Sequence, residues 1–171
     1  MPAGSPWQKS GSEVSAGEHR LEMTSLAIDD YEGFQVDDRE VLRDGPTYTA
    51  DTLETFGGDE EIFLILGADA VSRLRTWERH DVVLSRATVL VVPRPGSDVE
   101  LVSSELPEAI ILDMPALEVS GTHIRRMARE RRPYRFLVVE PVHDYIEDHQ
   151  LYAEPGGGDN VGVPERMEKS S

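Results

Sequence analysis

The sequence predicts an α/β protein built on a doubly wound parallel sheet. Three short apolar runs have the length of strands, at residues 62–66, 88–92 and 109–112. Strands that helices cover on both faces read as continuous apolar runs, whereas half-exposed strands alternate. Helical patterns separate or follow the three runs, and this alternation is typical of a parallel sheet.

Short local patterns predict the elements that precede the first of these strands. Ser15 and Glu18 form an S-x-x-E capping box, so we expect a helix from there to about residue 29. Phe34 and Val36 indicate a short strand before a turn at residues 44–46. Thr49 is placed to cap a second, short helix, which the glycine pair at 57–58 would end.

Helical patterns and breaker residues outline the rest of the chain. Helices are predicted over 69–84 in two pieces, over 122–131 and over 142–149. Residues 1–152 fit one domain, since 171 residues with 39% apolar side chains are enough for a modest core. Residues 153–171 are polar and glycine-rich without periodicity, so we expect a disordered tail there.

Composition and charge restrict the partners and the compartment. A formal net charge of −16 argues against a long nucleic acid, which usually binds a basic face. The absence of cysteine excludes disulfides and thiolate metal sites, and it fits a reducing cytoplasm. The apolar runs are far shorter than the ~20 residues that cross a bilayer. We therefore expect a soluble cytoplasmic protein that binds neither nucleic acid nor membrane, with a homo-oligomer left open.

One segment combines hydroxyls, a helix start and a cation. Ser120-Gly121-Thr122-His123-Ile124-Arg125 opens a predicted helix, where free N–H groups form an anion site. Arg125 follows Thr122 by three residues, which places both on one face of the first turns. The arrangement suits a polyphosphate. The alternative is an ordinary serine N-cap followed by a basic helix.

Polar residues also follow the first predicted strand. Gly67 would let a ligand approach the backbone, and Asp69 could bond ribose hydroxyls. In open α/β sheets, ligands bind beyond the carboxyl ends of the strands. The alternative is a plain strand-to-helix turn with Asp69 as its N-cap.

One tryptophan, one arginine and one segment with several hydroxyls are further candidates for a ligand site. Trp77 stands in a charged segment, and its indole face could stack on a flat, electron-poor ligand. Arg94 ends a strand, where it could meet a phosphate. Tyr48 and Thr49 lie at a helix start whose N–H groups could hold a carboxylate. The alternatives are a half-buried core tryptophan and a solvated turn arginine.

The order and spacing of these segments resemble bacterial nicotinate mononucleotide adenylyltransferases, over the stretch from Pro2 through Tyr152. The matching segments, in order, are Pro6-Trp7-Gln8-Lys9, Glu18-His19-Arg20 with Met23, Gly45-Pro46-Thr47-Tyr48-Thr49, Asp51-Thr52-Leu53, Gly67-Ala68-Asp69-Ala70, Thr76-Trp77, Arg94-Pro95-Gly96, Ser120 through Arg125, Pro141-Val142, Tyr145-Ile146 and Leu151-Tyr152.

The resemblance implies a Rossmann-like nucleotidyltransferase fold and a reaction of NAD synthesis. The adenylyl group of ATP would pass to nicotinate mononucleotide, with Mg²⁺, to give deamido-NAD and pyrophosphate. Five matching residues would bind ATP: Gly67 and Asp69 its adenosine, and Ser120, Thr122 and Arg125 its triphosphate. Five others would bind the mononucleotide or lie near the phosphates: Tyr48 and Thr49 at the nicotinate carboxylate, Trp77 on the ring, and Arg94 and Lys9 by the phosphates.

The sequence departs from this family at its most characteristic motif. G-[ST]-F-D-P-x-H-x-G-H, which follows the family's first strand, is absent, and its two histidines bind the ATP phosphates and stabilise charge in the transition state. The five histidines of this chain include no H-x-G-H pair, so we assign no catalytic residue and no metal ligand. His123 is interpreted as a bystander that helical spacing turns away from Arg125. Gly121 replaces the family's usual Ser or Ala.

By analogy, the absent part would hold the central strand, its helix and most of the second strand. We therefore expect residues 1–152 to form a nucleotidyltransferase domain that lacks its first strand and helix, folds poorly and is nearly inactive. A misplaced start, with Met1 an internal residue, is the simplest explanation. A true fragment and a degenerate paralogue stay open.

Three other functions compete with this interpretation. Another nucleotidyltransferase of the same fold, such as a pantetheine-phosphate adenylyltransferase, is disfavoured by Tyr48-Thr49 and Trp77, which fit nicotinate. A non-catalytic remnant would bind nucleotide without turnover. An acidic α/β interaction protein would bind neither substrate.

Overall fold

The computed structural model describes residues 1–4, 15–58, 60–93, 95–115 and 118–153. Its sheet has three parallel strands in the order β1-β2-β3, namely β1 (Phe63–Gly67), β2 (Thr88–Val92) and β3 (Ile110–Ile111). In the register of β1 on β2, Leu64 pairs with Val89 and Gly67 with Val92. The three predicted apolar runs are therefore strands, and the predicted parallel arrangement is confirmed.

Short helices surround this sheet and enclose the larger core. They are α2 (Thr49–Glu54), α3 (Ala68–Val71), the 3₁₀ turn η2 (Leu74–Thr76), α4 (His80–Arg86) and α5 (Val99–Glu105). The core draws on the strands and on all of these elements, with Ala50, Leu53, Ala68, Val71, Leu74, Val83, Val89, Val91, Val102 and Leu106 buried. The helical stretch predicted over 69–84 in two pieces is in three, because its middle part tightens into η2.

The prediction that the first strand is buried on both faces is wrong. Along β1, the side chains of Phe63 and Ile65 are exposed, Ile65 by 62%, while Leu64 and Leu66 pack against the core. Among the described residues, β1 pairs only with β2 and so forms an edge of the sheet. The central strand β2 meets the prediction in part, since Val89 and Val91 are buried on one face and Leu90 is partly buried on the other. An apolar edge strand is normally covered or paired in a folded protein.

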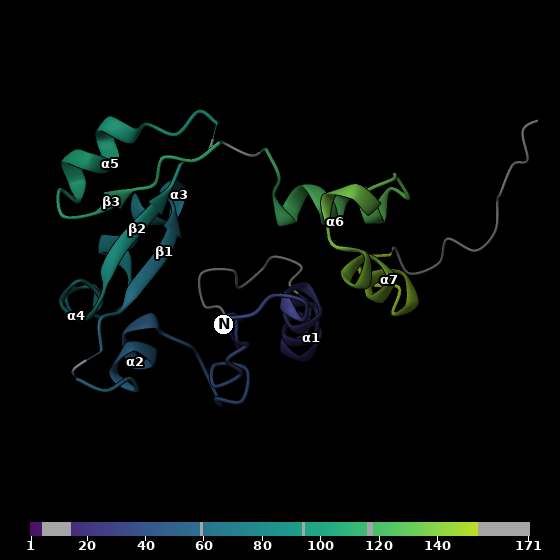
Figure 1. Cartoon of the computed structure of the whole chain (residues 1–171), viewed down its shortest axis with the longest axis horizontal. Helices are drawn as coiled ribbons and strands as arrows, with labels where there is room; N and C mark the ends of the chain where they lie inside the picture. The colour runs from purple at the N-terminus through teal and green to yellow at the C-terminus, as the bar shows by residue number, and fades with distance from the viewer. Residues whose placement is uncertain (5–14, 59, 94, 116–117, 154–171) are drawn as a thin grey trace, which may run out of the picture.

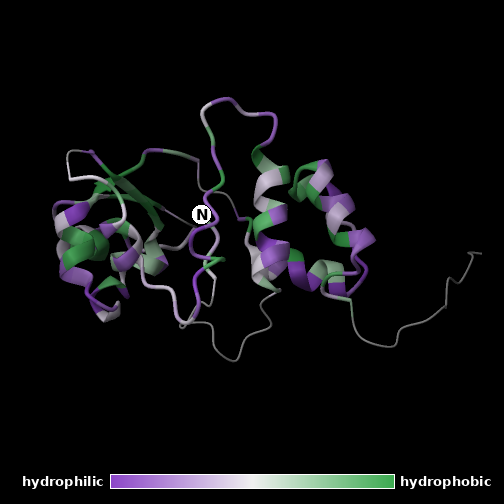
Figure 2. Ribbon diagram, turned by 90° about the horizontal axis from the view of Figure 1, so that it is seen from below, coloured by the Kyte–Doolittle hydropathy of each residue, from purple (hydrophilic) through white to green (hydrophobic). Residues whose placement is uncertain are grey.

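Three further helices form a second group beside the sheet (Figure 1). They are α1 (Gly17–Ile28), α6 (Gly121–Arg129) and α7 (Glu140–Asp148), with the 3₁₀ turn η3 (Arg135–Leu137) before α7. Their core is separate and consists of Met127, Tyr134, Val142 and Ile146, against which Met23 and Leu26 of α1 pack. Figure 2 shows the same division, with apolar ribbon concentrated in the strands and mixed colouring along the helices.

Helix α1 is confirmed, but its predicted capping box is not formed. The N-cap is Ala16, which makes no side-chain hydrogen bond to the helix. The hydroxyl of Ser15 lies instead 3.3 Å from the hydroxyl of Tyr152. This contact links the segment before α1 to the segment after α7. His19 on the same helix lies 2.9 Å, Nδ1 to hydroxyl, from Tyr145 of α7. Ser15 therefore makes a tertiary contact in place of the local cap that the sequence pattern predicted.

The strand predicted at Phe34 and Val36 is also wrong. The residues after α1 form consecutive turns, in which the Tyr31 N–H donates to the Ile28 carbonyl at 2.9 Å and Gly33 has a φ of 88°. Phe34 is 69% exposed and contacts the edge of the Tyr31 ring. Two apolar residues at alternate positions do not make a strand without a neighbouring strand to pair with. The turn at 44–46 is present, with Gly45 at a φ of 87°.

Helix α5 was not predicted, although a signal for it is present in the sequence. Asp98 is its N-cap and accepts a hydrogen bond from the Leu101 N–H at 2.9 Å. Glu100 lies in the first turn, where the helix dipole favours a negative charge. No helix in the described ranges is long and apolar enough to span a bilayer. The tail predicted over 153–171 lies outside the described residues except for Ala153.

One partly buried hydrogen bond is expected to make the stability of the helical group depend on pH. The Tyr134 hydroxyl donates to Glu147 Oε1 at 2.5 Å, and burial, followed by this carboxylate, raises the pKa of Tyr134 above its ordinary value. The fold therefore favours neutral tyrosine, and its contribution is present below about pH 10 and is lost as pH rises through the folded pKa. We expect Tyr134→Phe to lower the free energy of unfolding at pH 7 by about 1 kcal/mol.

Urea unfolding at pH 7 and near pH 10.5 measures this effect. Tyr134→Phe should also flatten the loss of stability at the higher pH, because the ionising group is gone. Tyr31→Phe is the matched control, since Tyr31 is exposed. A variant at Tyr134 that kept the wild-type pH dependence would contradict the assignment.

Candidate functional site

The start of α6 has the geometry that the sequence predicts. Ser120 is the N-cap, and its hydroxyl accepts a hydrogen bond from the His123 N–H at 3.2 Å. Arg125 Nη2 donates to Thr122 Oγ1 at 3.1 Å, so these two side chains share one face of the helix. Thr122 is exposed and Arg125 is partly exposed. A guanidinium, a hydroxyl and the N–H groups of a helix start together favour a phosphate group.

Gly121 leaves room for the tip of Arg125. A Cβ at position 121 would lie 3.0 Å from Arg125 Nη1 and would meet no other atom closer than 4.0 Å. Because that contact is with the end of a flexible side chain, Gly121→Ala should be tolerated. We expect it to raise the free energy of unfolding by about 0.5 kcal/mol, since alanine restricts the unfolded chain.

Urea denaturation of Gly121→Ala and of a contrasting variant, Gly33→Ala, tests this expectation. Gly33→Ala is the contrasting variant, because Gly33 has a φ of 88° that a residue with a Cβ rarely adopts. It should lower stability. Equal losses in the two variants would show that position 121 also requires glycine.

The carboxyl end of β1 presents the second group of predicted residues. Gly67 is the last residue of β1 and the N-cap of α3, and Asp69 lies in the first turn of α3. The alternative in which Asp69 caps the helix is therefore wrong. Its carboxylate lies 4.0 Å from Arg73 Nη2, and both side chains are largely exposed. Asp69 is thus at the end of the sheet where α/β proteins bind ligands.

The hydroxyl cluster lies at the start of α2, one residue from the predicted cap. Tyr48 is the N-cap and Thr49 the first helical residue, and no side chain caps the helix. Thr47, just before them, is buried, and its hydroxyl has no hydrogen-bond partner among the described residues. A buried hydroxyl without a partner is costly, so its place beside Tyr48 and Thr49 marks this segment as one that a polar ligand could complete.

Trp77 follows η2 and is half-buried against the core of the sheet. The predicted alternative of a tryptophan over the core therefore describes part of its environment. Its indole N–H is buried and has no hydrogen-bond partner in the part of the chain that the structure describes. Buried indole N–H groups usually find a partner. The exposed part of the side chain remains available to a ligand.

Two predicted site residues, Lys9 and Arg94, lie outside the described residues. The described ones contain no cluster of three or more His, Asp or Glu side chains arranged to hold a metal ion. A cavity of about 480 Å³ lies between α4, the start of β2 and the segment before β3, lined by Leu84, Thr88, Leu106 and Glu108 among others. It opens at the amino ends of the strands and contains none of the predicted site residues.

Comparison with known proteins shows the family of this chain. A family model described as cytidylyltransferase-like matches residues 1–127. The probable nicotinate-nucleotide adenylyltransferase of Corynebacterium kroppenstedtii is 38% identical over 161 residues, which cover 91% of this chain and 76% of the relative. That of Roseiflexus is 39% identical over 160 residues, covering 89% and 80%.

The chain belongs to the nicotinate-nucleotide adenylyltransferase family.

The fold of the chain is similar to that of solved adenylyltransferase structures. Nicotinic acid mononucleotide adenylyltransferase of Plasmodium falciparum, complexed with NaAD, matches with a TM-score of 0.65 and 17% identity, over 82% of this chain and 76% of that one. The complex with APC gives 0.63 and 16%, over 81% and 77%. The Rossmann-like α/β fold implied by the resemblance is thereby confirmed.

The predicted site residues that the structure describes fall into two groups on the two parts of the fold. Gly67, Asp69, Trp77 and the Tyr48-Thr49 segment lie on the sheet and its helices, whereas Ser120, Thr122 and Arg125 lie on α6 in the helical group (Figure 1). The structure confirms the face shared by Thr122 and Arg125. It also shows that Thr47, within the predicted hydroxyl cluster, is buried without a described hydrogen-bond partner.

Proposed function

We propose that this chain transfers the adenylyl group of ATP to nicotinate mononucleotide, giving deamido-NAD and pyrophosphate in cytoplasmic NAD biosynthesis. The observation that carries the proposal is the start of α6, where Ser120 caps the helix and Arg125 binds Thr122 on one face. This arrangement suits the triphosphate of ATP. The names of the relatives supply the second substrate.

The other site residues take the roles that the resemblance gives them. Gly67 and Asp69 contact adenosine, at the carboxyl end of β1. Thr49 and Tyr48 hold the nicotinate carboxylate, Trp77 stacks on the ring, and Arg94 and Lys9 lie near the phosphates. The partnerless Thr47 hydroxyl and Trp77 N–H support a polar ligand beside these segments.

The reaction needs no covalent enzyme intermediate. A phosphate oxygen of the mononucleotide attacks the α-phosphorus of ATP in line, the bond from that phosphorus to the bridging oxygen breaks, and pyrophosphate leaves. Arg125 and the N–H groups at the start of α6 hold the triphosphate and offset its charge. Positioning and electrostatic stabilisation therefore supply the rate.

Mg²⁺ enters this proposal as the ion that accompanies ATP. The described residues offer no cluster of carboxylates or histidines for it. When bound to the triphosphate, the ion would neutralise part of its charge. The side chains of this chain then act on the phosphates directly, through Arg125 and Thr122.

We further propose that residues 1–171 on their own bind substrates better than they turn them over. The sequence contains no H-x-G-H pair, which in the family stabilises charge in the transition state. Among the described residues, β1 has a strand on one side only, and Phe63 and Ile65 are exposed. Both observations support a second deficiency, a lower stability of residues 1–171. The non-catalytic remnant is the extreme form of this proposal.

Isothermal titration calorimetry, together with a deamido-NAD assay by chromatography, tests the function. We expect ATP and nicotinate mononucleotide to bind, and the amide form of the mononucleotide to bind about tenfold more weakly, because an amide cannot replace a carboxylate at backbone N–H groups. Slow formation of deamido-NAD supports the adenylyltransferase, and binding without any product supports the remnant. Tight binding of phosphopantetheine in place of the mononucleotide would overturn both.

A further inference from the structure

Arg79 has a backbone conformation that an arginine seldom adopts. Its φ is 53° and its ψ 43°, which lies in the left-handed region where residues with a Cβ are disfavoured. It is the N-cap of α4, and its carbonyl accepts hydrogen bonds from the N–H groups of Val82 at 3.0 Å and Val83 at 3.3 Å. A glycine would satisfy this backbone without strain, so the reason for an arginine must lie in its side chain.

The guanidinium of Arg79 binds two carboxylates of one helix. Nη1 donates to Asp51 Oδ1 at 2.8 Å, and Nη2 donates to Glu54. Asp51 and Glu54 are three residues apart in α2 and therefore lie on one face. Arg43 Nη1 lies 3.9 Å from the other oxygen of Asp51. The hydrogen bond with Glu54 raises the pKa of Arg79, so the guanidinium stays charged.

This double contact joins the two segments that would hold the nicotinate ring. Arg79 stands two residues after Trp77, and Asp51 stands two residues after Thr49. Both segments also reach the same core, since Trp77 packs against the cluster that contains Ala50 and Leu53 of α2. The Arg79 clamp therefore limits how far the loop that carries Trp77 can move relative to Tyr48-Thr49.

We propose that Arg79 is a positioning residue that sets the spacing between the Trp77 indole and the Tyr48-Thr49 segment, and so the affinity for the mononucleotide. This inference rests on the proposed function. A merely stabilising role is a poor explanation, because ion pairs this exposed contribute little to stability. A strained residue held by specific contacts is the pattern expected near a functional site.

The test compares four variants of the full chain by calorimetric titration with nicotinate mononucleotide and, separately, with ATP. Arg79→Ala and Arg79→Gly both remove the clamp, and Arg79→Gly also removes the backbone strain. We expect both to raise the Kd for the mononucleotide about tenfold and to leave the Kd for ATP within twofold. Arg79→Lys keeps one ion pair and should recover most of the affinity.

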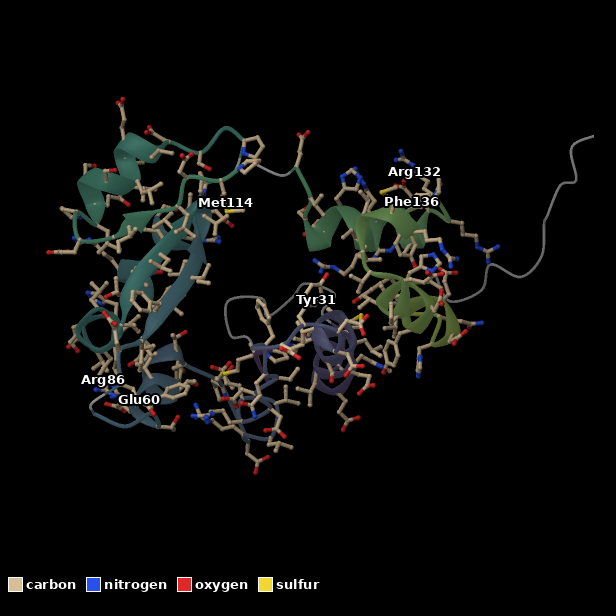
Figure 3. The ribbon with its side chains drawn as sticks, in the orientation of Figure 1. Tyr31, Glu60, Arg86, Met114, Arg132 and Phe136 are labelled. Carbon is tan, nitrogen blue, oxygen red and sulfur yellow. The ribbon has the colours of Figure 1, made fainter. Side chains whose placement is uncertain are left out.

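Arg86→Ala is the matched control. Arg86, labelled in Figure 3, lies in the same helix α4 and donates to the carbonyls of Phe56 and Gly57 just after α2. Arg86 links α4 to the end of α2 and has no contact with the Trp77 loop among its hydrogen bonds. The Kd of Arg86→Ala for the mononucleotide should therefore stay within twofold of the wild-type value. Equal effects of Arg86→Ala and Arg79→Ala would overturn the inference, because any loosening of α2 would then suffice.

Fluorescence of Trp77 gives a second readout. In a Trp7→Phe background, fluorescence reports Trp77 alone, and Arg79→Ala should shift its emission to longer wavelength while Arg86→Ala should not. Wild-type affinity in Arg79→Gly would overturn the positioning role alone. A wild-type chain that bound ATP but no mononucleotide would overturn the proposed function and this inference with it.

Discussion

Fusing a family strand and helix that carry G-[ST]-F-D-P-x-H-x-G-H ahead of Met1 should raise turnover by roughly 10²- to 10³-fold, the usual effect of a charge-stabilising group in a transition state. The gain has two physical sources. The histidines would add contacts to the ATP phosphates, and the added strand can pair with the edge of β1 that no described strand occupies. Exposed Ile65 and Phe63 would then be covered.

Steady-state deamido-NAD formation by the fusion and by residues 1–171 measures the first effect, and urea unfolding measures the second. A fusion with both histidines of H-x-G-H changed to alanine is the matched control, and it should gain stability without gaining turnover. If the fusion without the two H-x-G-H histidines were as fast as the intact one, the gain in turnover would come from folding alone. If residues 1–171 already matched the fusion, the proposed deficiency would be wrong.

The parts of the fold that could be predicted from the sequence are those fixed by apolar runs along the chain. The bounds of β2 follow from the run at 88–92, because four of its five residues are apolar and none of them is exposed in a strand with neighbours on both sides. The same reasoning failed for the burial of β1. The burial of Phe63 and Ile65 depends on which other elements cover β1, and residues 62–66 alone do not determine those elements.

Local polar patterns gave a mixed result, for a physical reason. Ser120 caps α6 as predicted, since its hydroxyl reaches the His123 N–H within the same turn. Ser15 had an equally good pattern, but its hydroxyl contacts Tyr152, which lies 137 residues away in sequence. A side chain with a distant partner cannot be assigned from its neighbours in sequence.

The candidate site shows the same limit. The helical spacing of Thr122 and Arg125 was enough to predict that they share one face, where the structure shows a hydrogen bond between them. Arg79 was not predicted, because its importance rests on a left-handed backbone and on carboxylates 25 and 28 residues away. Its only sequence signal is its place two residues after Trp77.

Arg125→Ala should weaken ATP binding by roughly 10- to 100-fold, because it removes charge-assisted hydrogen bonds that typically contribute about 1.5–3 kcal/mol. Arg125 is held on the face of Thr122, so its guanidinium is directed before ATP arrives and little ordering is needed on binding. Thr122→Val should give a smaller loss, since it removes one neutral hydroxyl and leaves the guanidinium in place. The Kd for nicotinate mononucleotide should change by less than twofold in both variants.

Calorimetric titration with ATP measures these losses, and Arg126→Ala is the matched control. Arg126 is exposed and is the next residue of α6, so it carries the same charge about 100° around the helix. Its loss should weaken ATP binding by no more than about twofold, which is the effect of net charge at a distance. Equal losses in Arg125→Ala and Arg126→Ala would mean that α6 attracts ATP by its overall charge and not by the face that Thr122 and Arg125 share. The different losses that we expect would assign the triphosphate to that face.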